Sequence, residues 1–79
     1  MADHETGIDF DLDGDYVELN QLLKLAGLVD SGGAGKALVA SGAVRVDGVT
    51  ELRKTCKIRL GQEVAVEGAG AVIRVVAPT

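Results

Sequence analysis

The spacing of hydrophobic residues changes along the chain and marks out a strand followed by a helix. Apolar and acidic residues alternate between residues 8 and 13, which is typical of a strand with one buried face. From Glu18 onward apolar residues recur at intervals of three and four, the spacing of one helix face; they are Leu19, Leu22, Leu23 and Ala26. Gly27 suits the left-handed residue that commonly ends a helix. The pattern therefore predicts a strand over residues 8–13 and a helix ending near Gly27.

A second helix is predicted over residues 32–41, although it contains several glycines. Asp30 or Ser31 can cap it by accepting a hydrogen bond from its first turn. Each helical glycine costs up to roughly 1 kcal/mol relative to alanine, so packing against the first helix must stabilise this one. We expect that packing to come from Ala34, Leu38 and Val39. The glycines serve either close helix packing alone or also the approach of a partner's backbone; they are Gly32, Gly33 and Gly35.

The second half of the chain shows the alternation of β-strands. Strands are predicted over residues 43–46, 49–52, 63–66 and 71–76. Asp47-Gly48 separates the first two and is a strong signal for a type I′ hairpin turn. Residues 53–57 are basic and show no regular period, and we call them the basic arm. Helices and strands thus occur together in a chain that is long enough for one domain.

Composition narrows the classes of protein that fit this pattern. A chain of 79 residues buries only roughly 60% of its unfolded surface, which leaves little core for a deep active site. The chain has no Trp, one Phe and one Tyr, so we expect an aliphatic core. Cys56 is the only cysteine, which excludes a disulfide within the chain and favours a reduced, cytoplasmic setting. No apolar run approaches the ~20 residues of a membrane helix, and the acidic start carries no export signal.

The net charge of −4 hides two regions of opposite character. Residues 1–15 carry six acidic residues and no Lys or Arg, whereas residues 16–79 carry eight basic and six acidic residues. We therefore divide the chain into an acidic N-terminal leader, residues 1–15, and a mildly basic domain, residues 16–79. Five basic residues lie close together in the sequence: Arg45, Arg53, Lys54, Lys57 and Arg59.

These basic residues are candidates for contacts to nucleic-acid phosphates. Lys36 adds a cation on the second helix, whose first turn offers free N–H groups and the positive end of the helix dipole. The shortage of aromatic residues argues against base stacking, so recognition of structured RNA by shape is the preferred interpretation. A solvated run of charges is the alternative. The predicted RNA-binding residues are Ser31, as the helix cap, and Lys36, Arg45, Arg53, Lys54, Lys57 and Arg59.

A series of short motifs also occurs in a characteristic order between Val17 and Val66. The series consists of Gly27-Leu28, Asp30-Ser31, Lys36-Ala37-Leu38-Val39, Gly42, Val44-Arg45-Val46-Asp47-Gly48, Arg53, Thr55, Ile58, Gly61 and Val64. It resembles the RNA-binding domain of small-subunit ribosomal protein S4. It looks closest to the small free-standing bacterial members of the YbcJ type, in which an Arg-Lys-x-Cys-Lys arm follows the hairpin. Here that arm is Arg53-Lys54-Thr55-Cys56-Lys57.

The resemblance implies an α+β fold, in which an α-helix pair packs on a small curved antiparallel sheet, the αL motif. It also implies RNA binding through the second helix and the basic arm. Gly32 stands where the wider family often has Arg, Lys54 replaces Pro, and Gln62 replaces Asp. Lys36 and the basic arm would therefore supply more of the binding. We expect a monomer that binds structured or ribosomal RNA in a ribonucleoprotein setting, with no membrane and no small-molecule substrate as partner.

The acidic leader offers a second interpretation. Asp9, Asp11, Asp13 and Gly14 match the first half of a calcium-binding loop. The twelfth position of that loop is Asn20 rather than Glu, so the bidentate ligand is missing. The same acids could keep an edge strand from pairing with other chains, or compete with RNA for the basic face. A protein-interaction or calcium-responsive module that uses the leader is therefore the alternative function.

No catalytic constellation is expected from the sequence. Gly35-Lys36 fails as a phosphate-binding loop, because Asp30 stands at the first glycine position and Ala37 replaces the Ser or Thr. Cys56 is either structural or a reactive thiol whose pKa is lowered by nearby cations, and His4, the only histidine, lies in the leader. No Cys/His cluster has the spacing of a metal site. We therefore expect no enzymatic activity, cofactor or metal.

Overall fold

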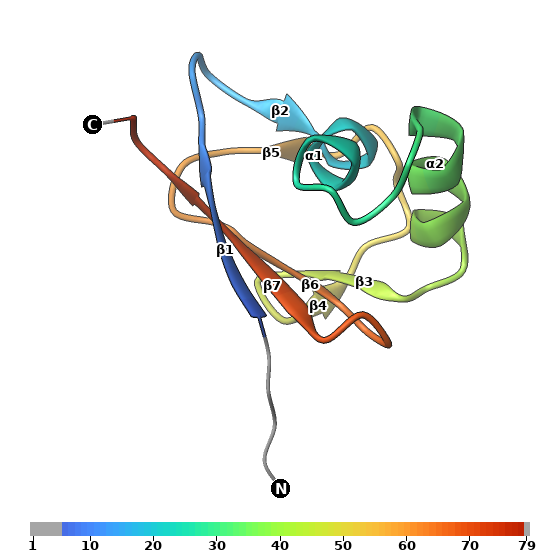
Figure 1. Ribbon diagram of the computed structural model, residues 1–79. Coiled ribbons are helices and arrows are strands. Elements are labelled where there is room, and N and C mark those ends of the chain that lie inside the picture. The colour runs from blue at the N-terminus through green and yellow to red at the C-terminus, as the bar shows by residue number, and fades with distance from the viewer. Residues whose placement is uncertain (1–5, 79) are drawn as a thin grey trace, which may run out of the picture.

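The computed structural model describes residues 6–78 and has two helices on one side of a sheet (Figure 1). The helices are α1, Leu19–Leu25, and α2, Gly32–Ala40. A five-stranded sheet has the order β1-β7-β6-β3-β4, and β2 and β5 form a separate two-stranded ribbon. The strands are β1 (Thr6–Asp11), β2 (Val17–Glu18), β3 (Val44–Val46), β4 (Val49–Thr50), β5 (Lys57–Ile58), β6 (Glu63–Val66) and β7 (Ala71–Val76). The predicted α+β fold with a helix pair on a small sheet is confirmed.

The sheet is mixed, whereas the resemblance implied an antiparallel one. β1 pairs with β7 in parallel, from Thr6↔Ala71 to Asp11↔Val76, while the other strand pairs in the sheet are antiparallel. Parallel strands need a long connection between them, and here that connection is almost the whole domain. No turn residues near β1 therefore reveal its direction. As predicted, the acidic strand lies at an edge of the sheet, with Asp9 and Asp11 exposed.

The β2–β5 ribbon is an element that the sequence pattern did not predict. Each strand has two residues, with Val17 opposite Ile58 and Glu18 opposite Lys57. Two residues are too few to show a period, and the partners lie some forty residues apart. Ile58 is fully buried, so the ribbon fastens the end of the basic arm to the start of α1.

The predicted end of α1 and the predicted hairpin turn are confirmed, whereas α2 ends at Ala40, one residue earlier than predicted. Gly27 has φ of 82° and follows the C-cap of α1. Its N–H donates to the carbonyl of Lys24, and the N–H of Leu28 donates to that of Leu23, both at 3.0 Å. This pair of bonds is the Schellman motif, which satisfies the last carbonyls of a helix. Asp47 and Gly48 have φ of 51° and 85°, as a type I′ turn requires.

Helix α2 is held by its cap and by one close approach to α1. Ser31, rather than Asp30, is the cap, and its Oγ accepts a hydrogen bond from the Ala34 N–H at 3.1 Å. A Cβ on Gly35 would lie 2.7 Å from the backbone oxygen of Asn20, so only glycine lets the helices approach this closely. Val39 is fully buried, but Ala34 is exposed, so its predicted packing on α1 is wrong. Ala34 instead supplies the N–H that Ser31 caps.

The core is aliphatic, as the composition predicted. It lies between the helix pair, the ribbon and the inner face of the sheet, and Leu12, just after β1, is also buried in it. The largest fully buried side chains are Leu19, Leu22, Leu23, Ile58 and Ile73. Full burial of such a side chain contributes roughly 1.5–3 kcal/mol. No helix among residues 6–78 is long and apolar enough to cross a membrane.

Candidate nucleic-acid interface

The basic arm leaves β4 and is bonded to the first turn of α1 through its backbone. The carbonyl of Lys54 accepts from the Asn20 N–H at 3.0 Å, and the carbonyl of Cys56 accepts from the Leu19 N–H at 2.9 Å. The N-cap residue of α1, Glu18, makes no side-chain capping bond. The arm therefore supplies acceptors that a helix start otherwise lacks. Although irregular, the arm is therefore fastened to the start of α1 at two backbone positions.

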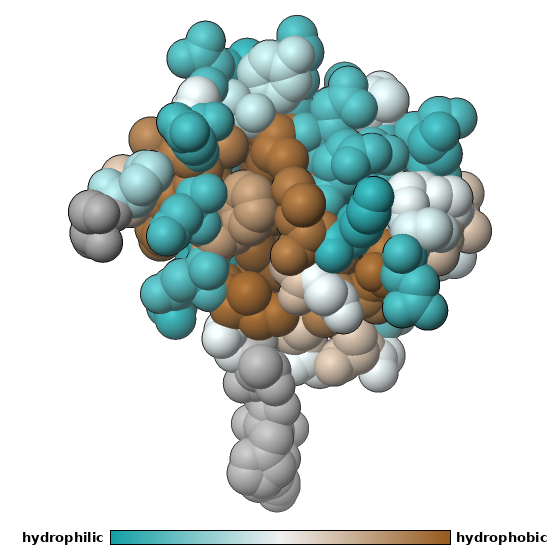
Figure 2. Space-filling view, turned by 45° about the horizontal axis from the view of Figure 1, so that its top comes forward, coloured by the Kyte–Doolittle hydropathy of each residue, from teal (hydrophilic) through white to brown (hydrophobic). Residues whose placement is uncertain are grey.

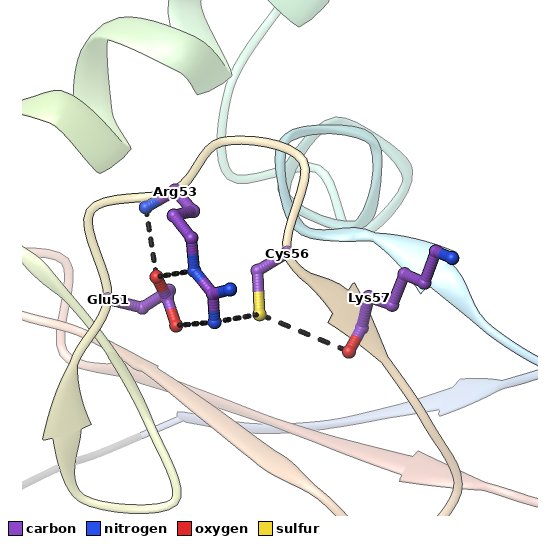
Figure 3. Close-up of polar contacts among 4 residues, drawn as sticks. All are labelled: Glu51, Arg53, Cys56 and Lys57. Carbon is purple, nitrogen blue, oxygen red and sulfur yellow. Dashed lines mark hydrogen bonds and ion pairs between the residues drawn. The ribbon is translucent and has the colours of Figure 1, made fainter.

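Arg53, at the start of the arm, is held by a carboxylate (Figure 3). The Oε2 atom of Glu51 accepts from the Arg53 backbone N–H and from Nε, both at 3.0 Å, and Oε1 accepts from Nη2 at 3.2 Å. These bonds lower the pKa of Glu51 to about 2, with the Arg53 side chain as the main cause. The Glu51 side chain is only 17% exposed, whereas that of Arg53 is 76% exposed. Arg53 thus faces solvent with two of its side-chain donor atoms already engaged.

Cys56 lies beside this ion pair and is partly buried. Its Sγ is 4.0 Å from Nη2 of Arg53 (Figure 3). Burial is the largest influence on the thiol and raises its pKa, and the Glu51 carboxylate raises it further; Arg53 acts in the opposite direction but more weakly. The reactive thiol with a lowered pKa, one of the two interpretations from sequence, is therefore wrong in direction. The sequence shows the cations close to Cys56, but it does not show that the thiol is partly buried or that the Glu51 carboxylate lies beside it.

Lys57 and Arg59 lie around an aromatic ring that the sequence interpretation had set aside. The Nζ atom of Lys57 is 5.0 Å from the centroid of the Tyr16 ring, and Cζ of Arg59 is 5.7 Å from it. Both distances are within the ~6 Å range of a cation–π contact. Tyr16 precedes β2, and continuing the β2–β5 register places it opposite Arg59. The short ribbon that brings these residues together gave no signal in the sequence.

The turn after Arg59 is tied to the tip of the β3–β4 hairpin. The Arg59 N–H donates to Oε1 of Gln62 at 2.7 Å, and Nε2 of Gln62 donates to Oδ2 of Asp47 at 3.1 Å. Oδ1 of Asp47 accepts from the Glu63 N–H at 2.9 Å. Because the Glu63 N–H and then Gln62 stabilise the carboxylate, the pKa of Asp47 is lowered. Gln62 therefore joins two turns near the basic residues.

Arg45 lies apart from the arm. Its neighbours Val44 and Val46 are buried toward the helices, so Arg45 faces the opposite side of the sheet. There its Nη2 atom is 3.0 Å from Oε2 of Glu67. Arg45 therefore does not join the other cations, and a carboxylate already neutralises it.

Lys36 is exposed on α2, beyond the turn that Ser31 caps. The basic arm passes beside α2 in both Figure 1 and Figure 3. Ser31 is itself exposed at the start of the helix. Helix α2 and the arm therefore lie side by side, although they are separated in the chain by the β3–β4 hairpin.

Asp9, an acidic residue of β1, forms an ion pair away from the basic arm. Oδ1 of Asp9 is 3.5 Å from Nε of Arg74 on the adjacent strand β7, at the edge of the sheet. Among residues 6–78 no group of three or more His, Cys, Asp or Glu side chains is placed to hold a metal ion. The part of the leader before residue 6, including His4, lies outside the described residues. Asp9 is thus paired with β7 and not with the arm.

The basic arm also borders a shallow hollow and exposed apolar side chains. The hollow, about 330 Å³, is lined by Arg53, Thr55, Cys56 and Lys57. A similar hollow of about 340 Å³ lies on the sheet, between Gly7, Glu63, Val72 and Arg74. Leu52, just before the basic arm, and Leu60, just after Arg59, are more than half exposed. Figure 2 shows one face on which hydrophobic residues gather in the middle, with hydrophilic residues around them.

Comparisons with known proteins agree with the motifs in the sequence. Residues 10–76 match the family model described as S4 domain. The Escherichia coli protein named "Putative RNA-binding protein YbcJ" is 51% identical over 53 residues, which cover 67% of this chain and 76% of that relative. The "Uncharacterized protein YbcJ" of Shigella flexneri matches equally well over the same share.

A solved structure matches the fold as well as the sequence. It is the solution structure of YbcJ from E. coli, described as revealing an αL motif involved in RNA-binding. The TM-score is 0.62 at 40% identity, and the match covers 94% of this chain and 90% of that one. The resemblance to the S4 domain and to the YbcJ type is thereby confirmed.

Proposed function

The chain belongs to the S4 domain family, and from this premise we propose that it is a non-catalytic RNA-binding module that contacts structured RNA through phosphate contacts from a basic face. The E. coli relative is named as RNA-binding, and its solution structure is described in terms of an RNA-binding motif. Of the residues expected from the sequence, the proposed site comprises Lys36, Lys54, Lys57 and Arg59, with Ser31 supporting the start of α2.

One observation carries this proposal. Within residues 6–78, neither Lys54 nor Lys57 nor Arg59 has a carboxylate oxygen within 4 Å of its charged nitrogens, although the chain as a whole is acidic. The segment that bears them is fastened by its backbone to α1. Cations on a rigid base lose less conformational freedom when they bind phosphates. The unpaired positive charge of these three residues, within the described part of the chain, supports the proposal.

The remaining residues contribute unequally in this proposal. Lys36, on α2 beside the arm, has no carboxylate oxygen within 4 Å of its Nζ atom among residues 6–78. Arg53 and Arg45 are each engaged by a carboxylate, so a phosphate must compete with Glu51 or Glu67 for them. Arg45, on the other side of the sheet, contributes least. We propose that the protein acts as a monomer in the bacterial cytoplasm, on ribosomal or another ribonucleoprotein RNA, without a small-molecule substrate.

Salt dependence of RNA binding tests the proposal. The logarithm of the association constant for a short hairpin RNA is measured against the logarithm of salt concentration for the parent, Lys57→Gln and Lys24→Gln. Lys24 is the matched control, since it is a solvent-exposed lysine on α1 outside the proposed site. Loss of one phosphate contact lowers the slope by roughly 0.7–0.9, so Lys57→Gln should show this change and Lys24→Gln should not. Equal slopes in all three proteins, or no binding at low salt, would contradict the proposal.

A further inference from the structure

Tyr16 is an aromatic side chain that the fold leaves on the surface. It is the only tyrosine of the chain, and it is 42% exposed. In the β2–β5 ribbon, Val17 and Ile58 face inward, so Tyr16, Lys57 and Arg59 share the outward face. The two cations lie 5.0 and 5.7 Å from the ring centroid. Two cations thus lie over the ring of a tyrosine that is itself exposed at the surface.

The ring and the cations beside it offer two kinds of contact. Glu18 lies opposite Lys57 in the ribbon, but among residues 6–78 no carboxylate oxygen lies within 4 Å of the charged nitrogens of Lys57 or Arg59. A nucleic-acid base carries no charge, and its flat face matches an aromatic ring, whereas Lys57 and Arg59 can contact the phosphates on either side of it.

We propose that Tyr16, Lys57 and Arg59 form a stacking site for one unpaired base of a structured RNA. This inference rests on the proposed RNA-binding function and adds the kind of RNA recognised, which is a helix with an unpaired nucleotide. Bases inside an A-form helix do not present their faces, so only a bulged, looped or terminal base can stack on Tyr16. The basic arm then holds the backbone of the adjoining helix.

A pair of matched RNAs tests the stacking site. One is a blunt duplex, and the other is the same duplex with a single bulged adenosine. Affinities are measured by fluorescence anisotropy for the parent, Tyr16→Phe, Tyr16→Leu and the control Leu25→Ala, which removes an exposed apolar side chain of α1. Stacking on one aromatic residue corresponds to about tenfold in affinity. The parent, Tyr16→Phe and Leu25→Ala should therefore prefer the bulged RNA about tenfold, and Tyr16→Leu should bind both RNAs equally.

Nuclear magnetic resonance gives an independent readout. Because the chain has one Tyr and one Phe, the ring signals of Tyr16 can be followed directly, and Phe10, packed against the core, reports on folding. The Tyr16 signals should move upfield with the bulged RNA and stay in place with the duplex. If the parent binds both RNAs equally, or if Tyr16→Leu keeps the preference, the stacking site is wrong while phosphate binding stands. If the parent binds neither RNA at low salt, the RNA-binding function fails and the stacking site with it.

Discussion

Arg53 and Lys57 lie four residues apart on the same basic arm, yet the fold treats their charges differently. Arg53 is enclosed by three hydrogen bonds to the carboxylate of Glu51. Lys57, together with Arg59, lies over the ring of Tyr16 and has no carboxylate partner within 4 Å in residues 6–78. The difference shows that the number of cations in a sequence does not give the number available to a ligand. Their partners in the fold decide that.

The two halves of the arm therefore have different tasks in this account. The Glu51–Arg53 pair shapes the start of the arm, because Glu51 also binds the Arg53 backbone N–H. Exposed ion pairs contribute only about 0–1 kcal/mol to stability, so the role of this pair is mainly local order. Lys57 at the end of the arm, and Arg59 just beyond it, keep their charge available. Ordering by the first half and binding by the second can be separated by substitution.

The largest expected effect comes from disturbing the start of α1, to which the backbone of the basic arm is bonded. In Gly35→Ala a new methyl group would lie 2.7 Å from the Asn20 carbonyl oxygen, and the N–H of Asn20 binds the arm. Overpacking of this kind typically costs about 1–3 kcal/mol, so thermal unfolding should show a clear loss of stability. Gly33→Ala is the control, since its methyl group would make only an ordinary contact, 3.8 Å from Ser31. That variant should gain up to roughly 1 kcal/mol, and an equal loss in both would exclude the close helix contact as the cause.

Removing the Glu51 carboxylate should make the charge of Arg53 as available to RNA as the charge of Lys57. Glu51→Gln frees the Arg53 guanidinium from its ion pair, so RNA binding should become more steeply salt-dependent, by nearly one unit of slope. Glu67→Gln is the matched control, because it removes the same charge and releases Arg45 on the far side of the sheet. The slope should be measured for both variants with the same hairpin RNA. A slope unchanged in Glu51→Gln, or increased equally in Glu67→Gln, would contradict the comparison.

A smaller effect is expected in the pH dependence of stability. The pKa of Glu51 is about 2 in the folded protein, below its ordinary value of 4.5. A carboxyl group with a lowered pKa contributes stability above its unfolded value and loses that contribution as the pH falls through its folded value. Glu51→Gln should therefore be less stable than the parent at pH 6, and the difference should shrink between pH 4.5 and 2. Urea unfolding across this range measures the difference in stability between the two proteins. A difference that stays constant with pH would show that the charge of Glu51 does not contribute to stability.

Elements set by local signals were predicted from the sequence. The cap by Ser31, the end of α1 at Gly27 and the Asp47-Gly48 turn each depend on residues within a few positions of one another. Helix α1 depends on a period that a short window reveals. The order of the family motifs added the RNA-binding interpretation, and the match to the S4 domain confirms the family.

Features that depend on distant pairing were not predicted. The parallel β1–β7 pair and the β2–β5 ribbon join segments from different parts of the chain, and neither has a turn that marks it. The position of Tyr16 among cations follows from that ribbon alone. The ion pair between Glu51 and Arg53 joins residues that are close in the sequence. It nevertheless depends on side-chain directions in an irregular segment, where no period fixes them.

The central claim is that Lys54, Lys57 and Arg59 are available to RNA, whereas Arg53 on the same arm is not. The most direct test compares Lys57→Gln with the double variant Glu51→Gln/Arg53→Gln, which removes the ion pair without leaving either charge alone. The salt dependence of binding to one hairpin RNA is measured for both and for the parent. We expect Lys57→Gln to lower the slope by roughly 0.7–0.9 and the double variant to leave it unchanged. A double variant that loses as much slope as Lys57→Gln would contradict the claim.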